Sequence, residues 1–98
     1  MYSNIAFYQF NDWFEDNRPN NFSYEGRSAL FNYLEELENE TGDRIRFDPI
    51  AFCCEYTEYN NLKEVQENYD GIENLEKLKA NTTVIEIENS EKLIIQNF

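Results

Sequence analysis

The sequence predicts a small α+β domain in which helices pack on a three-stranded, mainly antiparallel sheet, in the order α-α-β-α-α-β-β. Three observations predict this fold. The chain has 98 residues, which is enough for one domain spanning residues 1–98. Its aromatic share of 16% supplies a hydrophobic core that disordered acidic chains lack. Its hydrophobic residues recur at a helical period in some segments and alternate in others.

Two helices are expected in the N-terminal half. Hydrophobic residues recur at helical spacing over residues 5–16, and helix-breaking residues at 17–21 end this helix. Ser23 is a favourable N-cap for a second helix, and Gly42 is a favourable stop. One apolar stripe is expected to bind this helix to the core, formed by Leu30, Tyr33, Leu34 and Leu37.

The middle of the chain is expected to be extended. Residues 43–47 form either a short strand or an extended connection. The run 50–59 is rich in aromatic and other strand-compatible residues, so we expect a strand there. Alternation places one set of its side chains toward the core, namely Ile50, Phe52, Cys54 and Tyr56.

Two short helices and a hairpin are expected to follow. The helices are predicted over residues 62–69 and 72–79. The C-terminal segment alternates over 82–88, turns at Asn89-Ser90 and returns over 91–98, which is typical of a β-hairpin.

The charge balance points to the class of partner. Twenty Asp and Glu residues face eight Lys and Arg residues, so the net charge is -12. Nucleic acid and anionic membranes are therefore not expected as direct ligands. A basic partner protein is expected instead, because opposite charge speeds association.

Several sequence features predict a cytoplasmic protein. No apolar stretch approaches the roughly 20 residues of a membrane span. Residues Met1 to Asn4 lack the basic region of a signal peptide. The adjacent Cys53 and Cys54 are poorly placed to bridge each other, so we expect reduced thiols.

The sequence offers little for catalysis. It contains no histidine, the commonest general base and the commonest metal ligand, and so none stands beside Cys53 or Cys54. A glycine-rich phosphate loop and the ligand spacings of zinc and calcium sites are absent. We therefore expect no enzymatic activity, no cofactor and no metal site. The remaining catalytic alternative is a carboxylate-bound divalent metal.

The carboxylates are unevenly distributed. From Ser28 to Asp43 there is no basic residue, and the acidic stretch Asp12 to Asp16 lies near a single base, Arg18. Carboxylates three or four residues apart on a helix lie about 5–6 Å apart at Cβ, a spacing that a phosphate-binding groove accepts. The alternative is an ordinary solvated helix face. The expected partner-binding residues are Glu35, Glu36, Glu38, Glu40, Asp43, Glu55 and Glu58.

Four segments carry a resemblance to known proteins: 22–26, 29–37, 53–59 and 94–98. They read Phe-Ser-Tyr-Glu-Gly, Ala-Leu-Phe-Asn-Tyr-Leu-Glu-Glu-Leu, Cys-Cys-Glu-Tyr-Thr-Glu-Tyr and Ile-Ile-Gln-Asn-Phe. Together they resemble a group of small acidic proteins encoded by bacteriophages and other mobile elements. The resemblance implies a counter-defence role of the anti-restriction or anti-CRISPR type, in which several proteins mimic DNA. It assigns no role to any individual residue.

Two functions of different classes follow. The first is an inhibitor that occupies the nucleic-acid channel of a host defence protein, either a CRISPR effector or a restriction enzyme, through a DNA-mimicking carboxylate surface. The second is an adaptor or regulator that binds a protein through an apolar and tyrosine surface, including Tyr56, Tyr59 and Tyr69, with the acidity incidental. The oligomeric state is left open, with a homodimer as one option.

Overall fold

The computed structural model describes residues 5–98, and its architecture confirms the predicted α+β class. Residues Met1 to Asn4, which enter the signal-peptide expectation, lie outside the described range. In chain order the elements are α1 (Phe7–Asn17), α2 (Tyr24–Thr41), α3 (Pro49–Glu55), β1 (Tyr56–Tyr59), α4 (Leu62–Asn68), α5 (Leu75–Asn81), β2 (Val84–Glu86) and β3 (Leu93–Gln96).

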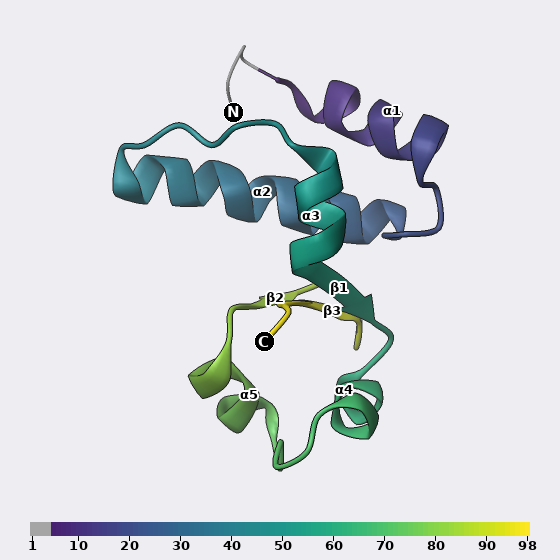
Figure 1. Cartoon of the computed structure of the whole chain (residues 1–98), viewed down its shortest axis with the longest axis vertical. Coiled ribbons are helices and arrows are strands. Elements are labelled where there is room, and N and C mark those ends of the chain that lie inside the picture. The colour runs from purple at the N-terminus through teal and green to yellow at the C-terminus, as the bar shows by residue number, and fades with distance from the viewer. Residues whose placement is uncertain (1–4) are drawn as a thin grey trace.

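The last strand occupies the centre of the sheet. The strand order is β1-β3-β2, and β3 pairs antiparallel with both neighbours. Ile94 of β3 lies opposite Glu58 of β1 and Ile85 of β2. Figure 1 shows α1, α2 and α3 at one end of the molecule, α4 and α5 at the other end, and the sheet between them. Helices therefore cover both faces of the sheet.

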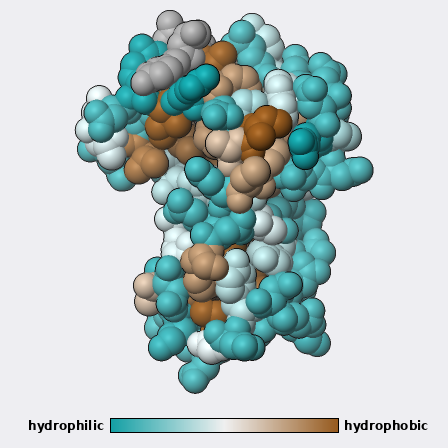
Figure 2. All heavy atoms as spheres, in the orientation of Figure 1, coloured by the Kyte–Doolittle hydropathy of each residue, from teal (hydrophilic) through white to brown (hydrophobic). Residues whose placement is uncertain are grey.

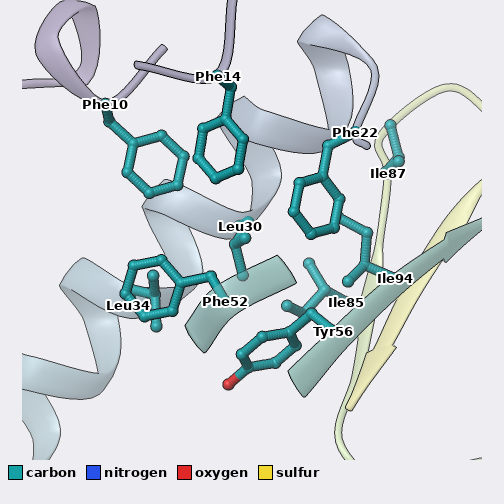
Figure 3. Close-up of a cluster of buried hydrophobic side chains, with 10 residues drawn as sticks. All are labelled: Phe10, Phe14, Phe22, Leu30, Leu34, Phe52, Tyr56, Ile85, Ile87 and Ile94. Atoms are coloured by element: carbon teal, nitrogen blue, oxygen red, sulfur yellow. The ribbon is translucent and has the colours of Figure 1, made fainter. Parts of the chain in front are cut away.

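Two hydrophobic clusters fill the two sides of the sheet. Alternation along β3 sends Ile94 into the cluster beneath α1, α2 and α3, and sends Leu93 and Ile95 into the cluster beneath α4 and α5. All three residues are buried, so the central strand reads as a continuous apolar run. Figure 3 shows the larger cluster, where Leu30 of α2 lies between aromatic rings and the side chains from the sheet.

The second helix begins and ends where its caps predict. The Ser23 side chain accepts a hydrogen bond from the Gly26 N–H (3.0 Å), and Gly42 adopts the left-handed φ of 75° that favours glycine. Leu30 and Leu34 are buried, whereas the other two members of the predicted stripe are half-buried at its edge.

The predicted strand over 50–59 is wrong in its first half, where the chain forms α3 instead. The Asp48 side chain accepts a hydrogen bond from the Ala51 N–H (3.2 Å), and Pro49 occupies the first turn, so both residues favour a helix start. Helical geometry then buries Phe52, and Tyr56 is buried where the helix gives way to β1. Ile50 and Cys54, which were expected in the core, are exposed because they lie on the outer side of this helix.

The other predicted elements are present with shifted boundaries. The helix expected over 72–79 begins at Leu75, because the Asn74 side chain caps it by accepting from the Lys77 N–H (2.8 Å). The C-terminal hairpin is confirmed with shorter strands, and Asn89 in its turn has a φ of 59°. Residues 42–48 form the extended connection rather than a strand.

The C-terminal residues bind back onto α3 and β1. The Asn97 N–H donates to the Glu55 carbonyl (2.7 Å), and the Asn97 side-chain amide donates to the Cys54 carbonyl (2.9 Å). The Thr57 hydroxyl donates to the Asn97 side-chain oxygen (2.7 Å). Next to the Asn97 hydrogen bonds, the ring of Phe98 stacks on Tyr69 at a centroid distance of 4.2 Å.

Because Tyr56 is buried, the free energy of unfolding is expected to fall at alkaline pH. Desolvation, with smaller effects of Tyr33 and Glu55, raises the pKa of its hydroxyl from 10 to about 12. The unfolded chain releases this proton near pH 10 and the folded chain near pH 12, so the unfolded state binds fewer protons between these values. The free energy of unfolding is therefore expected to fall through this window, by about 2 kcal/mol.

Urea denaturation of the wild type and of Tyr56→Phe, at about pH 9 and about pH 11.5, measures this effect. The phenylalanine variant keeps the ring and lacks the proton, so its stability is expected to fall less between the two pH values. Equal losses in the two proteins would contradict the assignment to Tyr56.

Candidate functional site

The basic residue of α2 points into the protein. Arg27 is the helix's one Lys or Arg, and its side chain is 4% exposed. Its guanidinium donates to the Asn11 side-chain oxygen (3.0 Å) and to the Glu15 carboxylate (2.6 Å). A third hydrogen bond reaches the Pro19 carbonyl (2.7 Å). Arg27 thereby joins α2 to α1 and to the loop between them.

The inward position of Arg27 leaves the solvent-facing surface of α2 without a basic side chain. That surface carries the exposed carboxylates Glu25, Glu36 and Glu40, whereas Glu35 and Glu38 are half-buried. Glu15, by contrast, is neutralised within the fold, so the acidic stretch 12–16 is less negative than its sequence indicates. Sequence reasoning missed Arg27, although its position three residues before Leu30 and seven before Leu34 places it on the apolar stripe.

A groove of about 460 Å³ runs between α2 and the segment that begins with β2. Half-buried Ala29 and Tyr33 and buried Ile85 and Ile87 contribute its less polar lining, and the exposed ring of Tyr24 stands on the α2 side. The rings of Tyr24 and Phe7 pack in a T-shaped arrangement with centroids 5.7 Å apart, which restrains the Tyr24 ring. The remaining lining residues are Glu25, Ser28, Asn32, Glu36, Glu86, Glu88 and Asn89.

The groove is electronegative. Its four carboxylates come from α2 (Glu25, Glu36) and from the β2 side (Glu86, Glu88), and none of its lining residues is Lys or Arg. Glu86 forms an exposed ion pair with Lys79 just outside it (3.4 Å). The sequence does not show that these two segments meet, because the packing of α2 on β2 is a long-range contact.

A second acidic hollow lies on the other flank of α2. It is lined by three of the predicted residues, Glu35, Glu38 and Asp43, together with Arg44. The half-buried Glu38 carboxylate accepts a hydrogen bond from the Ile45 N–H (2.6 Å) and so holds the chain that leaves α2. Arg44 moderates the charge of this hollow, which distinguishes it from the groove beside β2.

The last two predicted residues lie elsewhere. Glu55 is exposed at the end of α3. Glu58 of β1 is half-buried, and its carboxylate accepts a hydrogen bond from the Ser23 N–H (3.0 Å) at the start of α2, where a helix favours negative charge. Gly26 leaves room for this carboxylate, because a Cβ at that position would lie 2.9 Å from the Glu58 Cδ.

The structure therefore divides the seven predicted residues among several places. Glu35, Glu38 and Asp43 share one hollow, and Glu36 lines the groove. Glu40 is exposed one turn beyond Glu36, on the same flank of α2. Glu55 and Glu58 lie on the α3–β1 segment.

Large exposed hydrophobic side chains are scattered. Tyr8, Tyr24, Ile50 and Phe98 are between 48% and 67% exposed. Figure 2 shows hydrophobic spheres over α3 and near α1 and α2, and mostly hydrophilic spheres around α4 and α5. Tyr24 is the member of this set that lines the acidic groove.

Other kinds of site have little support among residues 5–98. Cys53 and Cys54 are free thiols, and burial raises the pKa of Cys53, which favours its unreactive protonated form. Within this range no His, Cys, Asp and Glu side chains are grouped so that three or more could hold a metal ion. No described helix is both long and apolar enough to cross a bilayer.

No protein-family model, curated protein or solved structure matches the chain. The function proposed below is therefore argued from the residues described above.

Proposed function

We propose that this chain is a binding protein that inhibits a nucleic-acid-binding defence protein of a host cell, a CRISPR effector or a restriction enzyme, in the cytoplasm. It presents carboxylates where the target binds phosphates. The carrying observation is the burial of Arg27, which leaves the outer surface of α2 with the exposed carboxylates Glu25, Glu36 and Glu40 and no basic residue of its own. The net charge of -12 attracts the basic channel of such a target over a distance.

The spacing of these carboxylates supports mimicry of a phosphate backbone. Glu36 and Glu40 are exposed and one helical turn apart, which is about 6 Å along the axis of α2. Phosphates of one DNA strand follow every ~3.4 Å of axis, so two phosphate steps span about 6.8 Å. Lys and Arg side chains that bind alternate phosphates can therefore reach both carboxylates.

A double charge reversal, Glu36→Lys with Glu40→Lys, tests this function. We expect inhibition of DNA cleavage by the target to weaken about tenfold or more, because each reversal replaces attraction by repulsion at a basic surface. The assay measures cleavage by host restriction enzymes and CRISPR effectors as a function of the concentration of the added chain. Circular dichroism verifies that the variant is folded.

A matched control separates position from net charge. Glu67→Lys with Glu73→Lys places the same reversal on exposed residues near α4, at the opposite end of the molecule (Figure 1). Each reversal adds two positive charges, so both double variants have a net charge of -8. The control should inhibit nearly as well as the wild type. Equal loss in both variants, or full inhibition by the α2 variant, would contradict the proposal.

The adaptor alternative predicts a different salt response. Inhibition through carboxylates should weaken steeply between 0.1 M and 1 M salt, since the Debye length falls from about 10 Å to about 3 Å. A partner held by an apolar and tyrosine surface would be nearly indifferent to salt.

A further inference from the structure

We propose that the groove between α2 and β2 is a docking site for an arginine side chain of the basic partner. This inference rests on the proposed function and deepens it, because it names the residue type by which the partner is recognised. It is carried by the joint presence of a concave surface, two tyrosines and four carboxylates in one groove.

The groove provides a contact for each part of an arginine. Half-buried Ala29, Tyr33 and the β2 segment offer a less polar surface against which the aliphatic stem can pack. Glu36 and Glu88 are exposed on opposite sides of the groove, one on α2 and one beyond β2, so a cation between them meets a carboxylate from either side. With no basic residue in the lining, these carboxylates remain available to an incoming cation.

Tyr24 favours arginine over lysine. A guanidinium is planar, stacks on aromatic faces and binds carboxylates with two parallel hydrogen bonds, whereas an ammonium is a compact, strongly hydrated charge. Tyr24 is 57% exposed at the groove, and its ring contacts Phe7 in a T-shaped arrangement with the centroids 5.7 Å apart. The ring is thus available to a cation without first having to be ordered.

Two blocked peptides serve as probes for this site, acetyl-Gly-Arg-Gly-Arg-Gly-amide and its lysine counterpart of equal charge. Each is titrated into the full-length ¹⁵N-labelled protein, with binding followed by NMR. We expect the arginine peptide to bind about three- to tenfold more tightly than the lysine peptide. The largest shifts should fall on residues 24–36 and 85–89. Equal affinities, or shifts centred on the hollow of Glu35 and Asp43, would overturn the proposal.

Two pairs of uncharged variants test the groove without altering its net charge. Tyr24→Leu removes the ring and should abolish the preference for arginine, whereas Tyr8→Leu, at an exposed tyrosine outside the groove, should keep it. Asn32→Leu partly fills the groove and should weaken both peptides. Asn39→Leu, on the other flank of α2, should weaken neither. Identical behaviour within either pair would overturn the site.

The outcomes separate this inference from the function on which it rests. If the Glu36 and Glu40 reversal abolishes inhibition while Tyr24→Leu and Asn32→Leu inhibit fully and bind both peptides like the wild type, the groove proposal is wrong and the inhibitor function stands. If the arginine preference is present and sensitive to Tyr24 while the reversal leaves inhibition intact, the arginine site stands and the proposed inhibitory surface is wrong.

Discussion

Replacing Phe10 by alanine is expected to lower the free energy of unfolding by about 3–5 kcal/mol, the range for a buried phenylalanine. Phe10 is completely buried and extends from α1 into the larger cluster (Figure 3). Its ring lies 5.1 Å from Phe14, 5.4 Å from Phe31 and 6.2 Å from Phe52, measured between centroids. Truncation leaves a cavity between α1, α2 and α3 that these rings cannot close together.

Urea denaturation followed by circular dichroism measures this loss. A domain of this size has a free energy of unfolding of about 5–15 kcal/mol, so the loss can leave the alanine variant only marginally stable. Phe10→Leu retains most of the volume and should lose less, which keeps the comparison measurable. Tyr8→Ala, at a 67% exposed position of the same helix, should change stability by no more than about 0.5 kcal/mol. A Phe10→Ala variant as stable as Tyr8→Ala would contradict the packing described for this cluster.

Replacing Arg27 by alanine is expected to cost about 3 kcal/mol, at the lower end of the range for breaking a buried ion pair. The buried stem loses its packing, and the Pro19 carbonyl and Asn11 side chain lose their donor. The cost stays at the lower end because the Glu15 side chain is 53% exposed and returns to water when its partner is removed.

Arg27→Met separates the two contributions, since methionine restores the apolar volume without the hydrogen bonds. We expect Arg27→Met to cost about 2 kcal/mol, at roughly 1 kcal/mol for each of the two hydrogen bonds that Asn11 and Pro19 lose, while the exposed Glu15 carboxylate returns to water. Arg18→Ala removes an exposed arginine and should change stability by about 0.5 kcal/mol or less. The free energies of unfolding from urea titrations decide the order. If Arg27→Ala lowers the free energy of unfolding no more than Arg18→Ala does, then Arg27 does not join α2 to α1.

The correction at α3 shows where local pattern fails. Residues 50–59 contain side chains that suit a strand, and their alternation is compatible with one buried face. The same residues also follow a helix start at Asp48 and Pro49, and a helix that ends just before Tyr56 likewise brings the rings of Phe52 and Tyr56 into one cluster. A short apolar run satisfies both periods, so tertiary packing chooses between them.

The sequence by itself determined the class of this fold, the caps of α2, the C-terminal hairpin and the excess of negative charge. These are local properties: Ser23 and Gly42 act on their own helix ends, and the alternation of 82–98 is visible within the segment. Only the tertiary structure decided which charges face the solvent together. In the folded chain the Arg27 side chain is buried, and the Glu58 carboxylate lies at the start of α2. Glu25 and Glu36 of α2 line one groove with Glu86 and Glu88. The physical reason is that a charge acts through space, and the distances between residues far apart in the chain are set by how the hydrophobic surfaces of α2 and the sheet pack.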